Sequence, residues 1–233
     1  MSIIDPRRSG AALWVLWVAA GALGGALATL FVLSPFGGMV SGYGNPAPLP
    51  YNLQFLAYAG VWAAIGVLFQ ALLLAYVLSV KKAAFLWLLA TLIGASLVSD
   101  LLHQLVYAFT YSSLFTSLPM STEASLFPMA MDVINPLTLG LPQGLALMLL
   151  TGRKAAPAIW IVGALLVLPL SSPFAHLFVP PVGTQPNLIA LFAASNAEGA
   201  AVTGLALLLV LRLGRPKGQP LEPRPIPVLQ SEG

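Results

Sequence analysis

Six long apolar stretches run along the chain, and short polar or Pro- and Gly-rich connections separate them. The stretches cover approximately residues 11–33, 54–80, 83–108, 129–151, 156–179 and 190–212. They are continuously apolar, without the amphipathic period of a helix that lies on a soluble core. Because roughly 20 apolar residues cross a bilayer core of about 30 Å, the pattern predicts an all-α integral membrane protein with six transmembrane helices.

The basic residues fall on alternate connections only, which indicates the orientation of these helices. The connections 34–53, 109–128 and 180–189 contain no Lys or Arg. By the positive-inside rule, we expect both termini to lie in the cytoplasm and the protein to lie in the plasma membrane. The residues on the predicted cytoplasmic side are Arg7, Arg8, Lys81, Lys82, Arg153, Lys154, Arg212, Arg215, Lys217 and Arg224.

The cytoplasmic ends of the stretches resemble one another, which suggests an internal repeat. The odd stretches begin with "RRSGAALW", "KKAAFLW" and "RKAAPAIW", and the even ones contain "QALLLAYV", "QGLALMLL" and "TGLALLLV". Aligned in this way, the chain is predicted to consist of three repeated helical hairpins. We interpret the three aligned tryptophans, Trp14, Trp87 and Trp160, as anchors at the inner membrane interface, where the indole N–H stays in water.

Composition agrees with a membrane protein and excludes several other classes. Hydrophobic residues make up 58% of the chain and charged residues only 7%, against about 25% charged in soluble domains. The net charge of +3 comes from short basic pairs beside apolar stretches, so it is read as a topology signal and not as a nucleic-acid surface. The chain has no cysteine, which excludes disulfides and thiol catalysis.

The chain is therefore expected to form one membrane domain, residues 1–215, followed by a Pro-rich cytoplasmic tail, residues 216–233. The first stretch could instead be a secretory signal peptide, but it is longer than the h-region of about 7–15 residues that such peptides contain. We expect it to remain as a helix, because the repeat makes it equivalent to the third and fifth stretches.

Prolines interrupt the fourth and fifth stretches, at Pro136, Pro142, Pro169 and Pro173. Each removes a backbone donor and disturbs the preceding turn, so kinks or breaks are expected there. Broken helices line the binding sites of many transporters, but a proline that merely bends a membrane helix is the alternative.

Small residues recur along three stretches, where helices of this protein or of partner subunits could approach closely. They are Gly21, Gly25, Ala59, Ala63, Gly66, Gly199 and Thr203.

Three acidic residues, Asp100, Asp132 and Glu198, lie inside apolar stretches and, on this topology, in the outer half of the membrane. Ionisable groups in a membrane normally face a bundle interior or a watery cavity. Asp100 and His103 share one helical face, and amides accompany the acids on neighbouring stretches. The predicted binding site comprises Asp100, His103, Asp132, Glu198, Asn135, Asn196, Gln143 and Gln70, the two glutamines lying deeper along the path.

Three function classes compete for these residues. The preferred one is binding or transport of a small solute, a cation or a proton; the second is an accessory subunit of a larger membrane complex, contacted through its small-residue faces and its tail. The third is a membrane enzyme, or a subunit that holds haem or chlorin through His103 or His176. No P-loop, Gly-x-Ser-x-Gly or His-Glu-x-x-His motif is present, so neither an enzyme nor a metal site is predicted.

Overall fold

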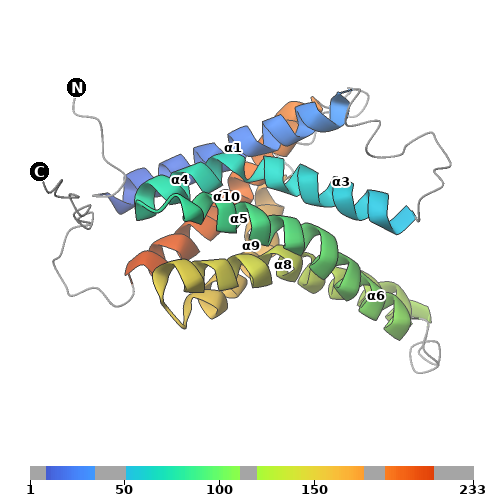
Figure 1. Ribbon diagram of the computed structural model, residues 1–233. Helices are drawn as coiled ribbons and strands as arrows, with labels where there is room; N and C mark the ends of the chain where they lie inside the picture. Colours follow the sequence, from blue (N-terminus) through green and yellow to red (C-terminus); the bar gives the residue numbers. More distant parts are fainter. Residues whose placement is uncertain (1–8, 35–50, 111–119, 176–186, 213–233) are drawn as a thin grey trace, which may run out of the picture.

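The computed structural model describes residues 9–34, 51–110, 120–175 and 187–212, and these residues form helices and short turns without a β-strand (Figure 1). The basic residues Arg7 and Arg8, the candidate ligand His176 and the predicted tail 216–233 lie outside them. The helices are α1 (Gly10–Leu33), α3 (Tyr51–Gly66), α4 (Leu68–Leu78), α5 (Lys82–Ile93), the π-helical turn η1 (Gly94–Val98), α6 (Ser99–Thr110), α8 (Met120–Thr151), α9 (Ala156–Ala175) and α10 (Leu188–Arg212).

Four described segments are long and apolar enough to cross a membrane, which confirms the all-helical, apolar character predicted from the sequence. They are Gly10–Leu33, Lys82–Val106, Val133–Thr151 and Leu188–Arg212. A fifth span results if the bent pair α3 and α4 counts as one, and the apolar part of α9, Ala156–Val167, is shorter.

Local sequence signals account for several helix ends. Ser9 caps α1, its Oγ accepting a hydrogen bond from the Ala12 N–H at 3.3 Å, as serine commonly does at a helix start. Gly152 follows α8 with a φ of +71°, the left-handed conformation in which glycine ends many helices. Ser79 adopts a φ of 56° after α4. Two tight turns therefore join α4 to α5 and α8 to α9.

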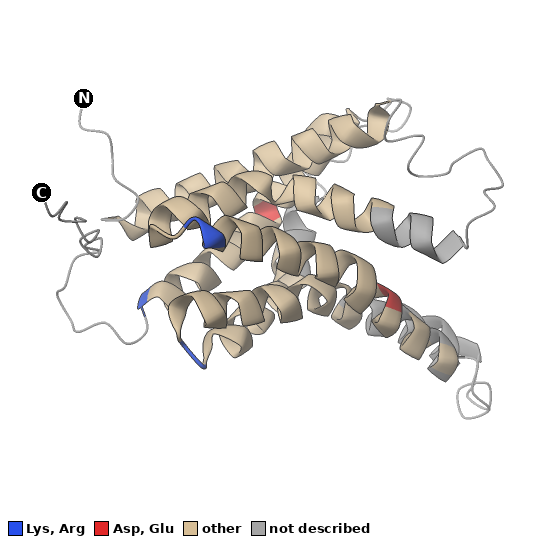
Figure 2. Ribbon diagram, viewed as in Figure 1, with Lys and Arg blue, Asp and Glu red and all other residues tan. Residues whose placement is uncertain are grey.

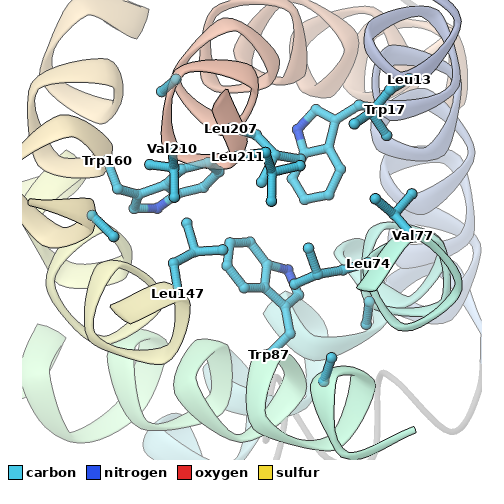
Figure 3. Close-up of a cluster of buried hydrophobic side chains, with 14 of the residues drawn as sticks. Leu13, Trp17, Leu74, Val77, Trp87, Leu147, Trp160, Leu207, Val210 and Leu211 are labelled. Carbon is cyan, nitrogen blue, oxygen red and sulfur yellow. The ribbon is translucent and has the colours of Figure 1, made fainter. Parts of the chain in front are cut away.

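The helices form a closed ring, in which each packs against its neighbours (Figure 1). Going around the ring, α1 contacts α4, α4 contacts α5, α5 contacts α8, α8 contacts α9, α9 contacts α10, and α10 returns to α1. The buried apolar core lies toward the end that holds the two tight turns, and it includes Leu13, Leu74, Leu147, Leu207 and Val210 (Figure 3). Toward the other end most described side chains are only partly buried.

The second stretch is broken, although it contains no proline. The axes of α3 and α4 differ by 52° at Val67. At this break the Gly66 carbonyl lies so close to the backbone of α1 that a Cβ atom at Gly24 would overlap it. The bend therefore lies where two backbones approach each other through a glycine, a tertiary contact that hydropathy along one stretch does not reveal.

Of the kinks or breaks predicted at the prolines of α8 and α9, the structure shows no break. The helix α8 continues through Pro136 and Pro142, and α9 continues through Pro169 and Pro173. Pro142 cannot donate to the carbonyl of Thr138, four residues earlier. A Cβ at Gly94 of η1 would collide with that carbonyl, so glycine leaves the freed oxygen room against the neighbouring helix. Packing of this kind lets membrane helices keep a proline.

Candidate functional site

Three tryptophans meet in the middle of the ring, one each from α1, α5 and α9 (Figure 3). The rings of Trp17, Trp87 and Trp160 pack edge to face, with centroids 5.2 to 6.2 Å apart. This is the preferred geometry of aromatic pairs. The three side chains are at most 2% exposed, so the cluster closes the bundle interior at this level.

This cluster corrects the interpretation of the tryptophans as interface anchors. Trp87 and Trp160 are buried inside the bundle, because their helices direct these positions toward the ring centre. Trp14 is only partly buried, and its Nε1 donates to the Ala201 carbonyl of α10 at 2.8 Å. The α1 member of the cluster is Trp17, one turn beyond the aligned residue.

A chain of hydrogen bonds joins α5, α8 and α9 around this cluster. The Trp160 Nε1 donates to Gln143 Oε1 at 3.2 Å, and Gln143 Nε2 donates to Thr91 Oγ1 at 2.8 Å. Thr91 in turn donates to the carbonyl of Trp87 at 2.9 Å. Gln143 and Thr91 are both buried, so each polar group here needs a partner in the protein.

The polar groups on the α1 side of the cluster are less completely paired. Trp17 Nε1 donates to Thr203 Oγ1 of α10 at 3.3 Å. Gln70 of α4 is buried, and its Nε2 lies beside Gly21 of α1. Within the part of the chain that the structure describes, the buried Trp87 Nε1 has no hydrogen-bond partner. This end of the interior therefore retains unused hydrogen-bonding capacity.

The two acidic side chains that the structure describes in the membrane helices lie apart. Asp100 is half-buried at the start of α6, where it accepts a hydrogen bond from Gln104 Nε2 at 2.6 Å. Glu198 lies on α10, and its Oε1 is buried without a hydrogen-bond partner among the described residues. The helix α6 packs mainly against η1 and α8, whereas α10 packs mainly against α1 and α9. Figure 2 likewise shows the acidic positions in two separate places.

The amides of the predicted site have separate surroundings. Asn135 is exposed on α8. Asn196 lies on α10 against Gly25 of α1, and its Nδ2 donates to the Phe192 carbonyl one turn earlier at 2.9 Å. The side chains of His103 and Asp132 lie outside the described residues, although their backbones belong to α6 and α8.

The structure thus brings Gln143 together with Thr91 and Trp160. The sequence had not indicated Thr91 as a member of the site, nor Trp17 as the third tryptophan of the cluster. The sequence carries one signal for Thr91, which is a hydroxyl residue one turn after Trp87 in an otherwise apolar helix. Among the described side chains, no three His, Asp or Glu residues lie close enough to hold one metal ion.

Comparison with protein-family models, with curated proteins and with solved structures found no match. The class of protein is therefore inferred from the sequence and structure of this chain alone. Long apolar helices with large apolar side chains on the outer surface, such as Leu149 and Phe85, are typical of a helical membrane protein.

Replacing Gln143 with leucine should destabilise the bundle by about 1–3 kcal/mol, because the buried Trp160 N–H would lose its acceptor. The measurement is unfolding in mixed micelles, followed by far-UV circular dichroism. The exposed Gln104→Leu variant is the control and should change stability by less than about 0.5 kcal/mol. Equal stability of the two variants would show that the interior network does not stabilise the fold.

Proposed function

We propose that this protein spans the plasma membrane six times and binds a small polar solute, a cation or a proton in the outer half of its bundle. On this proposal α3 and α4 form one bent span and α9 completes the six, with both termini in the cytoplasm. Conduction of the bound species across the membrane is part of the proposal.

The distribution of charge supports this orientation. The described basic residues gather at one end of the bundle, the end at which α1 begins and α10 ends (Figure 2). Lys81 lies at the turn before α5 and Lys82 begins that helix, and Arg153 and Lys154 lie at the turn before α9. Arg212 ends α10. By the positive-inside rule this end faces the cytoplasm.

Equal spacing supports three repeated hairpins. Trp14, Trp87 and Trp160 are separated by equal intervals, and Gln70 and Gln143 by the same interval again. In the structure Trp160 donates to Gln143, and the buried Trp87 and Gln70 occupy the corresponding positions one interval earlier.

Glu198 is the observation that carries the binding proposal. It lies 14 residues from Arg212, roughly 21 Å along a helix, which places it in the outer half on this topology. An acid in a membrane helix is retained where it faces a partner or water, yet its buried Oε1 has no partner among the described residues. A bound cation, a polar solute or a transferred proton would supply one.

The tryptophan cluster gives this proposed site a closed inner boundary. Trp17, Trp87 and Trp160 fill the ring centre nearer the basic end. A solute that enters from outside would reach Glu198 before this cluster. Conduction would then require the three rings to part. Gln143 donates to Thr91, one turn outward of Trp87, and Gln70 lies beside Gly21, one turn outward of Trp17. A solute from outside would therefore meet both amides before it reached the rings.

The proposal is tested by flux into proteoliposomes, with protons, Na⁺ and K⁺ as the probes. Wild-type protein should carry at least one of them faster than protein-free vesicles, and Glu198→Gln should reduce that flux about tenfold, as expected for a barrier raised by about 1.4 kcal/mol. Ser195→Ala, which removes an exposed hydroxyl from the same helix, should have no effect. Flux that is absent from the wild type, or unchanged by Glu198→Gln, would contradict transport of these ions.

A second candidate is an accessory subunit of a larger membrane complex. The observation that favours it is the separation of Asp100 from Glu198, on helices that pack mainly against different neighbours. Partner helices could then satisfy each acid separately. Purification in mild detergent distinguishes the two functions, because a subunit should co-purify with defined chains in constant ratio and a self-sufficient transporter should not.

A further inference from the structure

An aromatic pair joins α3 to α10 in the half of the bundle that lies away from the basic residues. The rings of Trp62 and Phe192 meet edge to face, with centroids 6.4 Å apart and planes at 89° to each other. The helix α3 packs against α1 and against α5 and η1, whereas α10 packs mainly against α1 and α9. The pair therefore links two helices that have their main packing contacts elsewhere.

This pair closes the angle between α3 and α10 on the inward side of α1. Trp17 points from α1 into the ring centre (Figure 3), and Gly24 follows it at i+7 on the same helical face. Gly24 lies against the Gly66 carbonyl of α3, and the next residue, Gly25, lies against the Phe192 carbonyl of α10. The two helices thus flank the inward face of α1, and their aromatic side chains meet across it.

Polar groups of the interior lie between this pair and the tryptophan cluster. On α1, Gly25 lies eight residues beyond Trp17, so the pair is roughly 12 Å outward of the cluster. Within that interval, Gln70 Nε2 and the Asn196 carbonyl both lie beside Gly21. A solute that enters from outside would therefore pass the aromatic pair before it reached these polar groups.

The helix that carries Trp62 is a separate short element. It ends at Gly66, and the axis of the chain turns by 52° before α4 begins. Hinges of moving elements are typically a few residues at helix ends, and Val67 occupies such a position. Rotation at Val67 would carry Trp62, five residues earlier, away from Phe192 while α4 stayed in the core.

We infer that Trp62 and Phe192 form an outer gate over the proposed binding site, and that movement of α3 about Val67 opens it. The inference rests on the proposed function for the identity of the site and adds how access to it is controlled. On α10, Phe192 lies six residues before Glu198, roughly 9 Å farther from the cytoplasmic end. One aromatic pair changes an equilibrium by about two- to tenfold, so a gate held by this pair opens readily.

The test measures access to Gln70 from outside and uses the absence of cysteine from the chain. A Gln70→Cys reporter in whole cells is treated with a membrane-impermeant cationic methanethiosulfonate, and mass spectrometry of the purified protein gives the modification rate. Trp62→Ala and Phe192→Ala should each raise this rate about two- to tenfold, because each removes the same pair. The double variant should raise it no further than the larger single effect, since both substitutions act on one contact.

A second aromatic pair of α3 provides the matched control. Tyr58, one turn before Trp62, stacks on Phe31 of α1 with centroids 6.4 Å apart. Tyr58→Ala removes an aromatic contact from the same helix without touching the link to α10, so it should leave the modification rate unchanged. Far-UV circular dichroism verifies that each variant is folded, and Trp62→Leu, which keeps most of the apolar volume, replaces Trp62→Ala if that variant unfolds.

Two results would overturn the gate. One is a modification rate that neither Trp62→Ala nor Phe192→Ala raises, and the other is a rate that Tyr58→Ala raises as much as they do. Flux of protons, Na⁺ and K⁺ into proteoliposomes, measured with Gln70 intact, separates the gate from the proposed function. A modification rate that responds to Trp62→Ala without flux in any variant supports the gate and contradicts transport of these ions, whereas wild-type flux with an unresponsive rate contradicts the gate alone.

Discussion

Replacing Trp87 with alanine is expected to destabilise the bundle by about 3–5 kcal/mol, the largest effect of any single substitution considered for this chain. Trp87 is fully buried and packs edge to face against both Trp17 and Trp160. In a membrane the hydrophobic effect does not drive helices together, so association depends on packing contacts. A cavity at the ring centre removes such contacts from several helices at once. Unfolding in mixed micelles measures the loss.

Phenylalanine variants separate packing from hydrogen bonding at the same cluster. Trp160→Phe removes the donor to Gln143 Oε1 and leaves a buried acceptor unpaired, whereas the Trp87 Nε1 has no partner to lose. Trp87→Phe should therefore be less destabilising than Trp160→Phe, by about 1 kcal/mol. The reverse order would mean that Trp87 Nε1 is paired in the membrane, with Gln70 as the nearest analogue of Gln143.

The helices that the structure describes were predictable because lipid-exposed helices must satisfy their backbone internally and keep apolar surfaces. The first stretch was expected at residues 11–33 and α1 covers Gly10–Leu33. The last was expected at 190–212 and α10 covers Leu188–Arg212. The boundaries of both helices coincide with local signals, the Ser9 cap at the start of α1 and Arg212 in the last turn of α10.

The bends were not predictable in the same way, because they depend on contacts between distant segments. Pro142 was expected to kink or break its helix, yet Gly94 leaves space for the freed Thr138 carbonyl and α8 continues. The break occurs instead at Val67, where α1 approaches through Gly24. One stretch of sequence does not show which glycine will face which carbonyl.

The candidate site likewise combines a residue that the sequence predicts with contacts that it does not reveal. Gln143 was predicted to belong to the site as an amide that accompanies Asp132 on the same stretch, and it is buried with two partners. It did not identify those partners, because Thr91 and Trp160 resemble common membrane-helix residues until the ring brings them together. Whether Asp100 and Glu198 serve one solute remains a prediction, for which the flux measurements are the test.

Two glycines in contact, Gly24 of α1 and Gly66 of α3, should respond very differently to replacement by alanine. Gly24→Ala places a Cβ where the Gly66 carbonyl already lies, so α1 must separate from the α3–α4 bend. We expect a loss of about 3 kcal/mol, the upper end of the overpacking range, despite the gain of up to about 1 kcal/mol that alanine brings to a helix. Gly66→Ala should be tolerated, because its Cβ would meet only Ala28 at an ordinary 3.9 Å. Unfolding in mixed micelles measures both variants. If they are equally stable, the contact at Gly24 does not hold the bend in the membrane, and the broken second span would need another cause.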